Sequence, residues 1–353
     1  MRIGILTGGG DCSGLNAVIR SVAKHLILSQ NAEIIGFENG FLGLIENQYR
    51  KLDYKSVSGI LAQGGTILGT HNKANPLRYF GADNADVSDQ VLANYNALNL
   101  DGIIVIGGDG TMSISHALEK KGIKIIGVPK TIDNDLMQTD RTFGFDTAVG
   151  VATEAIDRLQ TTGQSHERVM ILETMGRYAG WIALEASIAG GADIVLIPEI
   201  PYDIERVAEV CKARSQRQRF TIIVVAEGAA PKDGEMTVRE RIDDSPDPLR
   251  LGGVANVIRF ELEKRIQSEI RVTVLGHIQR GGTPTHFDRV LATRYGSFAA
   301  QSAIENKWGT MVALQKNELV RVPLSEVANK TKRVPLDDDL IVAAKAVGTS
   351  FGI

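Results

Sequence analysis

Residues 3–14 read IGILTGGGDCSG, an apolar run rich in isoleucine that ends in three glycines and an aspartate. Apolar residues then recur at helical spacing from Leu15 to Leu26, so this stretch predicts a strand, a tight glycine loop and a helix. Ser13 is placed to cap that helix. The backbone N–H groups of the loop and the positive end of the helix favour a bound anion, and the alternative is a plain tight turn.

The order of strand, glycine-rich or polar loop and helix repeats along the chain. Further strands are predicted at 33–37, 102–106 and 123–128 and, after a helix at 148–159, at 168–172, 194–197, 220–226 and 271–276. Strands that alternate with helices form mostly parallel sheets covered on both faces. We therefore expect an α/β fold of two doubly wound, Rossmann-like lobes, with an active-site cleft between them at the carboxyl ends of the strands. The polar segment 231–248 is expected to be an exposed excursion.

Composition narrows the class of protein. The chain has 353 residues, a formal net charge of −3 and 5% aromatic residues, which fits two globular domains and makes nucleic acid or an acidic membrane surface an unexpected partner. Its two cysteines, Cys12 and Cys211, supply neither a disulfide framework nor a zinc-ligand pair. The apolar stretches are too short to span a bilayer and the chain begins directly with a strand, so we expect no membrane segment and a cytoplasmic location.

A second motif, GGDGT at 107–111, follows a predicted buried strand. Asp109 is placed there to hold Mg²⁺, a hard cation that prefers oxygen ligands, and the flanking glycines leave room for phosphates. The alternative is an aspartate that only caps a helix or forms a turn.

A third motif, PKTIDND at 129–135, ends another strand with two carboxylates two residues apart. One of Asp133 and Asp135 can accept a hydroxyl proton while the other organises a metal or water. Lys130 brings positive charge for a phosphoryl group. On its own such a turn is more often structural, and its position beside the GGDGT loop favours the chemical interpretation.

The second half of the chain supplies cations near its predicted strand ends. Arg168, Arg177, Arg271, His277 and Arg280 are candidates for holding phosphate, because a guanidinium can clamp phosphate in a bidentate manner. Each alone is more often a surface group or an ion-pair partner. Glu227 follows an apolar strand and could accept hydrogen bonds from a sugar hydroxyl.

Six motifs lie between residue 4 and about residue 296 in a fixed order: GGGDCSGLN, GGTILGT, GGDGT, PKTIDND, MGRYAG and GHIQRGG. The same motifs occur in this order in 6-phosphofructokinases, and the chain resembles that family. The resemblance implies transfer of a phosphoryl group from ATP, with Mg²⁺, to the 1-hydroxyl of fructose 6-phosphate. It also implies a donor lobe of residues 1–145 plus about 284–335, and a fructose 6-phosphate lobe of residues 146–283 plus about 336–353.

The resemblance assigns roles residue by residue. Asp133 is the base, supported by Thr131 and Asp135, and Asp109 binds Mg²⁺. The donor phosphates are expected to contact Gly10, Gly108, Asp109, Gly110 and Thr111. The sugar is expected near Met175, Gly176, Arg177 and Glu227, with the 6-phosphate on His277 and Arg280. Arg168 and Arg271 match positions that reach into a neighbouring subunit's site, which implies a homotetramer or a homodimer.

Two positions that resemble the family's donor discriminators point in different directions. Gly110 resembles ATP users, because a side chain there would crowd the nucleoside. Lys130 matches the lysine that pyrophosphate users have at this position, where its ammonium group can hold a phosphate. Steric exclusion discriminates more sharply than one added cation, so we expect ATP, with pyrophosphate as the alternative. The family's arginine at the donor phosphates falls on Asn72, and Lys73, one position later, is the candidate for its role.

Two other classes of function remain alternatives. NAD kinases and lipid kinases share a GGDGT loop, but they lack the PKTIDND and GHIQRGG pair. A regulatory subunit that binds sugar phosphate without turnover would be expected to have lost its carboxylates, whereas Asp109, Asp133 and Asp135 are all present.

Overall fold

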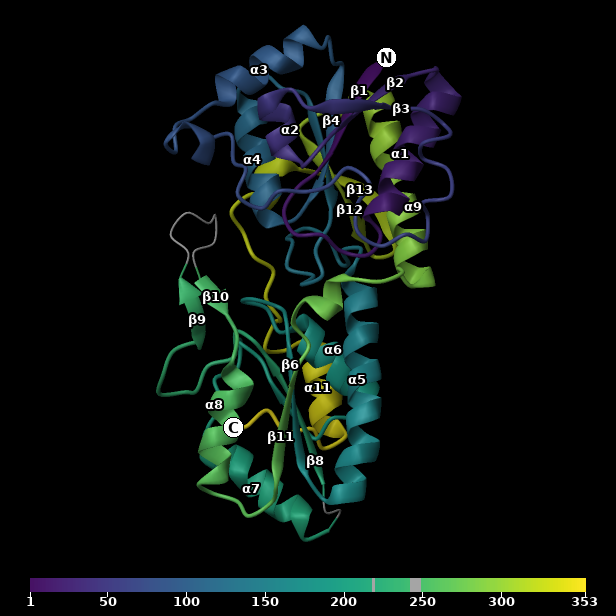
Figure 1. Cartoon of the computed structure of the whole chain (residues 1–353). Coiled ribbons are helices and arrows are strands. Elements are labelled where there is room, and N and C mark those ends of the chain that lie inside the picture. The colour runs from purple at the N-terminus through teal and green to yellow at the C-terminus, as the bar shows by residue number, and fades with distance from the viewer. Residues whose placement is uncertain (218–219, 242–248) are drawn as a thin grey trace.

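The computed structural model describes residues 1–217, 220–241 and 249–353, which form two lobes, each built around its own sheet (Figure 1). The first sheet has the strand order β13–β12–β5–β4–β1–β2–β3. Neighbours from β12 to β2 run parallel, whereas β3 and β13 are antiparallel edge strands. The strands are β1 (Arg2–Thr7), β2 (Glu33–Phe37), β3 (Tyr49–Leu52), β4 (Gly102–Gly107), β5 (Ile125–Pro129), β12 (Thr310–Gln315) and β13 (Glu318–Pro323).

The second sheet is wholly parallel, in the order β11–β6–β8–β7. Its strands are β6 (Val169–Thr174), β7 (Ile194–Leu196), β8 (Thr221–Ala226) and β11 (Ile270–Val274). A separate antiparallel pair is formed by β9 (Val238–Arg241) and β10 (Leu249–Leu251). The expected polar excursion contains β9 and is mostly exposed over residues 232–241, and residues 242–248 of it lie outside the described part of the chain.

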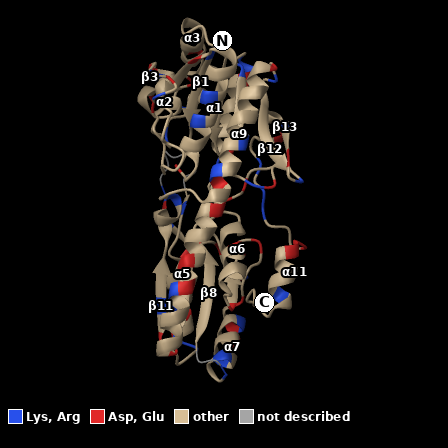
Figure 2. Ribbon diagram, turned by 90° about the vertical axis from the view of Figure 1, so that its right-hand side faces the viewer, with Lys and Arg blue, Asp and Glu red and all other residues tan. Residues whose placement is uncertain are grey.

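Helices cover both sheets (Figures 1 and 2). In the first lobe they are α1 (Leu15–Gln30), α2 (Phe41–Glu46), the 3₁₀ turn η1 (Phe80–Ala82), α3 (Ser88–Ala97), α4 (Asp109–Lys120), α9 (His286–Ile304) and α10 (Leu324–Val327). In the second they are α5 (Phe145–His166), α6 (Trp181–Gly190), α7 (Ile204–Ser215), α8 (Val254–Glu263), the 3₁₀ turn η2 (Gly276–Arg280) and α11 (Asp339–Ala346). None of the helices in the described ranges is long and apolar enough to cross a lipid bilayer.

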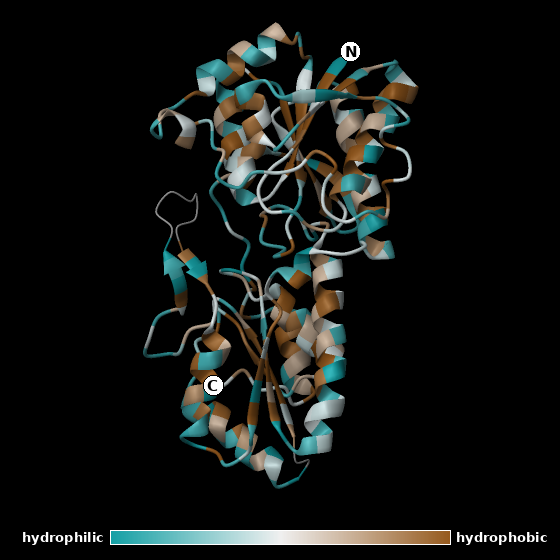
Figure 3. Ribbon diagram, in the orientation of Figure 1, coloured by the Kyte–Doolittle hydropathy of each residue, from teal (hydrophilic) through white to brown (hydrophobic). Residues whose placement is uncertain are grey.

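The predicted fold class is confirmed, because two mostly parallel sheets carry helices on their faces. Central strands such as β4 and β8 are buried along their whole length, which is why they read as uninterrupted apolar runs (Figure 3). One cluster of buried side chains continues from Ile5 in the first sheet through Phe143 to Leu172 in the second. The lobes therefore share apolar core at their junction.

The N-termini of α5 and α9 bind each other where the chain crosses between the lobes. Asp288 is fully buried, and its Oδ2 accepts hydrogen bonds from Thr147 N (2.8 Å) and Thr147 Oγ1 (2.6 Å). Thr285 Oγ1 in turn donates to Asp146 Oδ2 at 2.6 Å. Each side chain satisfies backbone or hydroxyl donors at the start of the other helix, so the two helices are held as a rigid joint.

Ser13 does not cap α1, which corrects the expectation from sequence. Gly14 occupies the N-cap position, and no side chain caps it. The Ser13 hydroxyl donates instead to the carbonyls of Gly282 (2.9 Å) and Gly281 (3.2 Å). It therefore ties the first glycine loop to the segment that follows η2.

Replacing Asp288 by Asn should change how stability depends on pH. Burial raises the pKa of Asp288 to about 6, so the folded state holds this proton more tightly than the unfolded state does. Because of this group, the free energy of unfolding of the native protein should decrease as the pH rises from about 4 to about 6. Asp288→Asn keeps an oxygen for Thr147 but does not titrate. In thermal melts at pH 4, 5, 6 and 7, the Tm of the variant relative to that of the native protein should therefore increase with increasing pH.

The exposed Asp233 supplies the matched control. Asp233→Asn should differ from the native protein by a Tm difference that is nearly constant over the same pH range. A constant difference for Asp288→Asn as well would contradict the proposed cost of its buried charge.

Candidate active site

The three loops that carry the predicted phosphate and metal residues lie side by side, because they follow adjacent parallel strands. β1, β4 and β5 are neighbours in the first sheet, so their carboxyl ends meet at one edge. A Cβ added to Gly8 would lie 2.8 Å from Thr111 Oγ1, and one added to Gly9 would lie 3.7 Å from Lys130 Nζ. The glycines thus let the first loop approach the other two closely.

Asp109 does not act as the cap of α4. Gly108 is the N-cap residue, and no side chain caps the helix there. Asp109 is the first helical residue, half-exposed beside the glycine loop. Gly110 follows it and is exposed, and no atom of the described residues lies within 4 Å of a Cβ added to it. A side chain at position 110 would therefore project into open space next to the loop.

The PKTIDND segment forms a stapled turn. Asn134 has a left-handed backbone (φ 51°), and its Oδ1 accepts a hydrogen bond from Thr142 N at 3.0 Å. Asp133 N donates to Thr131 Oγ1 at 3.0 Å, and Thr142 Oγ1 donates to the carbonyl of Thr131 at 2.8 Å. These bonds fix the backbone on both sides of Asp133 and Asp135, so the two carboxylates have little freedom to move apart.

Like charge is concentrated at this turn. Asp133 and Asp135 are 5% and 6% exposed, and in the described structure the Oδ1 atom of each is buried without a hydrogen-bond partner. Burial, together with the negative charges of Asp133 and Asp109, raises the pKa of Asp135 to about 7, and the positive charge of Arg177 opposes this rise. These oxygens are strong acceptors that can bind a cation, a proton or a hydroxyl group.

Cations surround the turn from both lobes. Lys130 is buried, and its Nζ donates to the carbonyl of Gly10. Burial lowers the pKa of Lys130, with Arg280 and Arg177 acting in the same direction and Asp133 acting against them. A Cβ added to Gly10 would collide with the Arg280 guanidinium. Arg280 therefore extends from the second lobe to the glycine loop of the first.

The end of β8 brings a further carboxylate. Glu227 Oε1 accepts a hydrogen bond from Arg177 N at 3.1 Å. Burial raises the pKa of Glu227 to about 7, with a further contribution from the negative charge of Asp133. Gly176 and Arg177 both have positive φ angles, of 141° and 50°, which turn the chain sharply after β6. Glu227 and Arg177 thus belong to the same cluster as the carboxylates of the first lobe.

The remaining predicted residues lie on three segments: Met175 after β6, His277 on η2, and Asn72 with Lys73 on the loop after the GGTILGT motif. Met175 packs against the shared apolar core, and His277 is exposed on η2, three residues before Arg280. Asn72 and Lys73 are exposed on the loop that follows the GGTILGT motif.

Arg168 and Arg271 are not brought to the cluster. Both lie at the amino-terminal ends of their strands, since Arg168 precedes β6 and Arg271 pairs with Met170. The cluster lies beyond Thr174 at the other end, about 15–20 Å away at roughly 3.3 Å per residue. Both guanidinium groups bind Glu269.

A comparison with known protein families is consistent with this geometry, since a family model described as phosphofructokinase matches residues 2–303. The chain belongs to the phosphofructokinase family. The chain is 53% identical to "ATP-dependent 6-phosphofructokinase 2" of Clostridium perfringens, over 99% of this chain and 98% of that protein. It is also 47% identical to "Pyrophosphate--fructose 6-phosphate 1-phosphotransferase" of Streptomyces coelicolor, over 95% of this chain and 96% of that protein.

Among solved structures, the phosphofructokinase of Pichia pastoris in the T-state superposes with a TM-score of 0.80 at 30% identity. The match covers 92% of this chain and 35% of that one, so this phosphofructokinase spans about a third of the length of the yeast chain. The resemblance inferred from the six motifs is confirmed, and so is the phosphofructokinase fold.

The carboxylates of this phosphofructokinase fit Mg²⁺ as an ion shared with a substrate. In the described ranges no three His, Cys, Asp or Glu side chains are close enough to hold a metal by themselves. Mg²⁺ commonly keeps several waters and binds through one or two carboxylates together with substrate phosphates. Asp109, beside the glycine loop, and the unpartnered oxygens of Asp133 and Asp135 suit that kind of site.

Two residues that sequence reasoning missed position the site. Lys332 N donates to the carbonyl of Asp135 at 2.7 Å, and Lys332 Nζ donates to the carbonyl of Thr139 at 2.8 Å. Trp181 Nε1 in the second lobe donates to the carbonyl of Lys332 at 3.1 Å. The chain that crosses from α10 to α11 therefore braces the turn of Asp133 and Asp135 against the second lobe. No motif marks this lysine, so only the three-dimensional fold identifies it.

Glu173 is the second such residue. It is 3% exposed at the end of β6, and its two oxygens accept hydrogen bonds from Gly253 N (2.8 Å) and Ala255 N (2.9 Å). The carboxylate thus holds the N-terminus of α8, where a negative charge is favourable. The available signal in the sequence was a glutamate directly after an apolar run and two residues before the MGRYAG motif.

Proposed function

We propose that this protein transfers the γ-phosphoryl group of ATP to the 1-hydroxyl of fructose 6-phosphate, giving fructose 1,6-bisphosphate and ADP. The observation that carries the proposal is the position of Asp133. Its carboxylate is buried, the Oδ1 atom has no hydrogen-bond partner among the described residues, and cations and carboxylates from both lobes surround it. Two relatives, 53% and 51% identical to this chain, bear the name of this activity.

In this proposal Asp133 removes the proton from the 1-hydroxyl as its oxygen attacks the phosphoryl group. Thr131 and Asp135 keep the turn in place and maintain its negative charge. Lys130 neutralises charge that develops on the transferred group. Phosphoryl transfer depends mainly on such positioning and charge neutralisation, because the loose transition state needs little covalent help.

The donor phosphates would lie on the glycine loop and the start of α4, at Gly10, Gly108, Gly110 and Thr111, with Asn72 and Lys73 at their side. Asp109 would hold Mg²⁺, which would neutralise phosphate charge when bound with the donor. Met175, Gly176, Arg177 and Glu227 would surround the sugar, and His277 with Arg280 would hold the 6-phosphate.

Two observations favour ATP over pyrophosphate as the donor. The space around Gly110 is open, so a nucleoside can pass this position. Lys130 Nζ donates to the Gly10 carbonyl, so part of its hydrogen-bonding capacity braces the glycine loop, and it is less available than a free cation to replace nucleotide contacts. Pyrophosphate is the second candidate, because one relative of 47% identity is named for it.

We further propose a cytoplasmic homo-oligomer, either a dimer or a tetramer, in which Arg168 and Arg271 serve a neighbouring subunit's site. Their distance from the site of their own chain leaves them no role there. Arg271 lies in β11 and Arg168 directly precedes the neighbouring strand β6. Within the described part of the chain β11 is an edge strand with one side unpaired, so a second subunit can approach both residues.

The donor assignment is tested by measuring fructose 6-phosphate phosphorylation with MgATP and with Mg-pyrophosphate. We expect the native protein to prefer ATP by at least about 10-fold in kcat/KM. Gly110→Asp should lower kcat/KM for ATP by about 100-fold or more, since a like charge against the donor phosphates costs several kcal/mol. Gly150→Asp, an exposed helical position on α5 with open space around it, should leave both donors unaffected.

The same assay with Asp133→Ser separates an enzyme from a regulatory subunit. Loss of the base should lower kcat by roughly 100- to 10,000-fold while the KM for fructose 6-phosphate changes little. A preference for pyrophosphate in the native protein would overturn the donor assignment, and a near-normal kcat for Asp133→Ser would overturn the role of that residue.

Sharing of sites between subunits is tested by coexpression of Arg271→Ala with Asp133→Ser. Each variant alone should have little activity. In mixed oligomers some sites combine an intact Asp133 with an intact Arg271 from the neighbour, so roughly a quarter of the native activity should return on random assembly. Activity in the mixture equal to the sum of the two separate variants would contradict a shared site.

A further inference from the structure

The turn at residues 71–74 is closed by the side chain of His71. The Nδ1 atom of His71 accepts hydrogen bonds from the backbone N–H groups of Lys73 (3.3 Å) and Ala74 (3.1 Å). Nδ1 accepts these bonds through the lone pair in the plane of the ring. This arrangement resembles the turns that Asn and Asp close with a side-chain oxygen.

The ring that closes this turn is itself held in place. It stacks on Phe80, with ring centroids 5.3 Å apart and an interplanar angle of 18°. Phe80 in turn packs on Tyr79 at 4.9 Å, and Tyr79 is buried and donates its hydroxyl hydrogen to Glu46 Oε1 at 2.5 Å. The imidazole is therefore anchored through two aromatic rings to α2, and its Nδ1 keeps a fixed direction.

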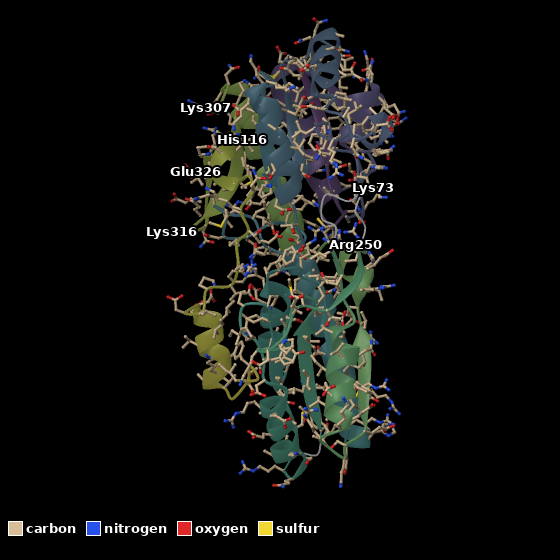
Figure 4. The ribbon with its side chains drawn as sticks, turned by 90° about the vertical axis from the view of Figure 1, so that its left-hand side faces the viewer. Lys73, His116, Arg250, Lys307, Lys316 and Glu326 are labelled. Atoms are coloured by element: carbon tan, nitrogen blue, oxygen red, sulfur yellow. The ribbon has the colours of Figure 1, made fainter. Side chains whose placement is uncertain are left out.

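The turn begins beside the proposed donor loop. Thr70 Oγ1 donates to the carbonyl of Gly9 at 2.5 Å, so the chain leaves the glycine loop and enters the His71 turn directly. Lys73 is exposed, and in the described part of the chain no ion pair occupies its ammonium group. Figure 4 shows Lys73 on the first lobe, above Arg250 of β10 and on the same side of the molecule.

We propose that His71 is a positioning residue that directs Lys73 to the phosphate chain of the donor. This inference rests on the proposed donor site and adds a specific residue to its affinity. A flexible lysine loses conformational entropy when it binds a phosphate, and a fixed backbone at its Cα reduces that cost. His71 supplies the fixed backbone without touching the donor itself.

Asparagine provides a discriminating substitution, because its Oδ1 can take the place of Nδ1 as the acceptor. Alanine and glutamine place no acceptor there. The binding of MgADP and of Mg-pyrophosphate is measured by calorimetry on the purified full-length protein for His71→Ala, His71→Gln, His71→Asn, Lys73→Ala and the double variant His71→Ala/Lys73→Ala. His166→Ala, an exposed histidine at the far end of α5, is the control.

We expect His71→Ala and His71→Gln to raise the Kd of the donor-site ligand by about 3- to 10-fold and His71→Asn to restore it to within about 2-fold. The double variant should bind no more weakly than Lys73→Ala alone, because His71 acts through that lysine. In the kinase assay the KM for MgATP should rise with little change in kcat or in the KM for fructose 6-phosphate.

Three results would overturn the inference: additive losses in the double variant, no rescue by His71→Asn, or an unchanged Kd in His71→Ala. Weak binding that comes with a large fall in Tm would show a general folding role and would also contradict it. The inference would also be overturned if the native protein bound neither MgADP nor Mg-pyrophosphate. Calorimetry needs no turnover, so the two proposals can fail independently. A protein that binds MgADP but does not phosphorylate fructose 6-phosphate would refute the proposed function, and the Kd values of the variants would still decide the role of His71.

Discussion

The site depends on two buried carboxylates, Asp133 and Asp135, whose mutual repulsion must be compensated from the other lobe. Each is almost wholly buried with an unpartnered oxygen. An uncompensated carboxylate inside a protein costs several kcal/mol, and here Arg177 of the second lobe offsets part of that cost. The interaction that offsets the buried charge is therefore also one that joins residues of the two lobes at the proposed site.

The rest of the structure maintains this arrangement across the junction. The two helix N-termini joined through Asp288 and Thr147 fix the lobes on one side. On the other side Lys332 binds the turn of Asp135 and is bound by Trp181. Arg280 of the second lobe reaches the glycine loop of the first lobe at Gly10. A phosphorylated sugar and a metal-bound nucleotide need this kind of fixed, charged space, because most of the barrier to phosphoryl transfer is overcome by position and charge.

Much of the fold and part of the cluster could be predicted from sequence because the relevant signals are local. A buried parallel strand such as β4 is a continuous apolar run, and its last residue, Gly107, leaves room for the side chain of Thr111, which a Cβ at that position would meet. Edge strands β3 and β13 were missed, since half-exposed strands carry mixed composition and pair according to tertiary context. The capping role given to Ser13 was wrong because a distant segment at 281–282 competes for its hydroxyl. Lys332 and His71 could not be recognised either, because their hydrogen bonds depend on the folded path of the chain.

The most direct test of the compensation between the lobes is a carboxyl ¹³C NMR titration of Asp135 in the native protein and in Arg177→Met, with Arg259→Met on the exposed face of α8 as the control. The native protein should titrate with an apparent pKa of about 7. Removing the guanidinium removes a charge that favours the ionised carboxylate, so the pKa in Arg177→Met should rise above that value and the control should match the native protein. An unchanged or lower pKa in Arg177→Met would show that the charges of the two lobes are not coupled and would contradict the account.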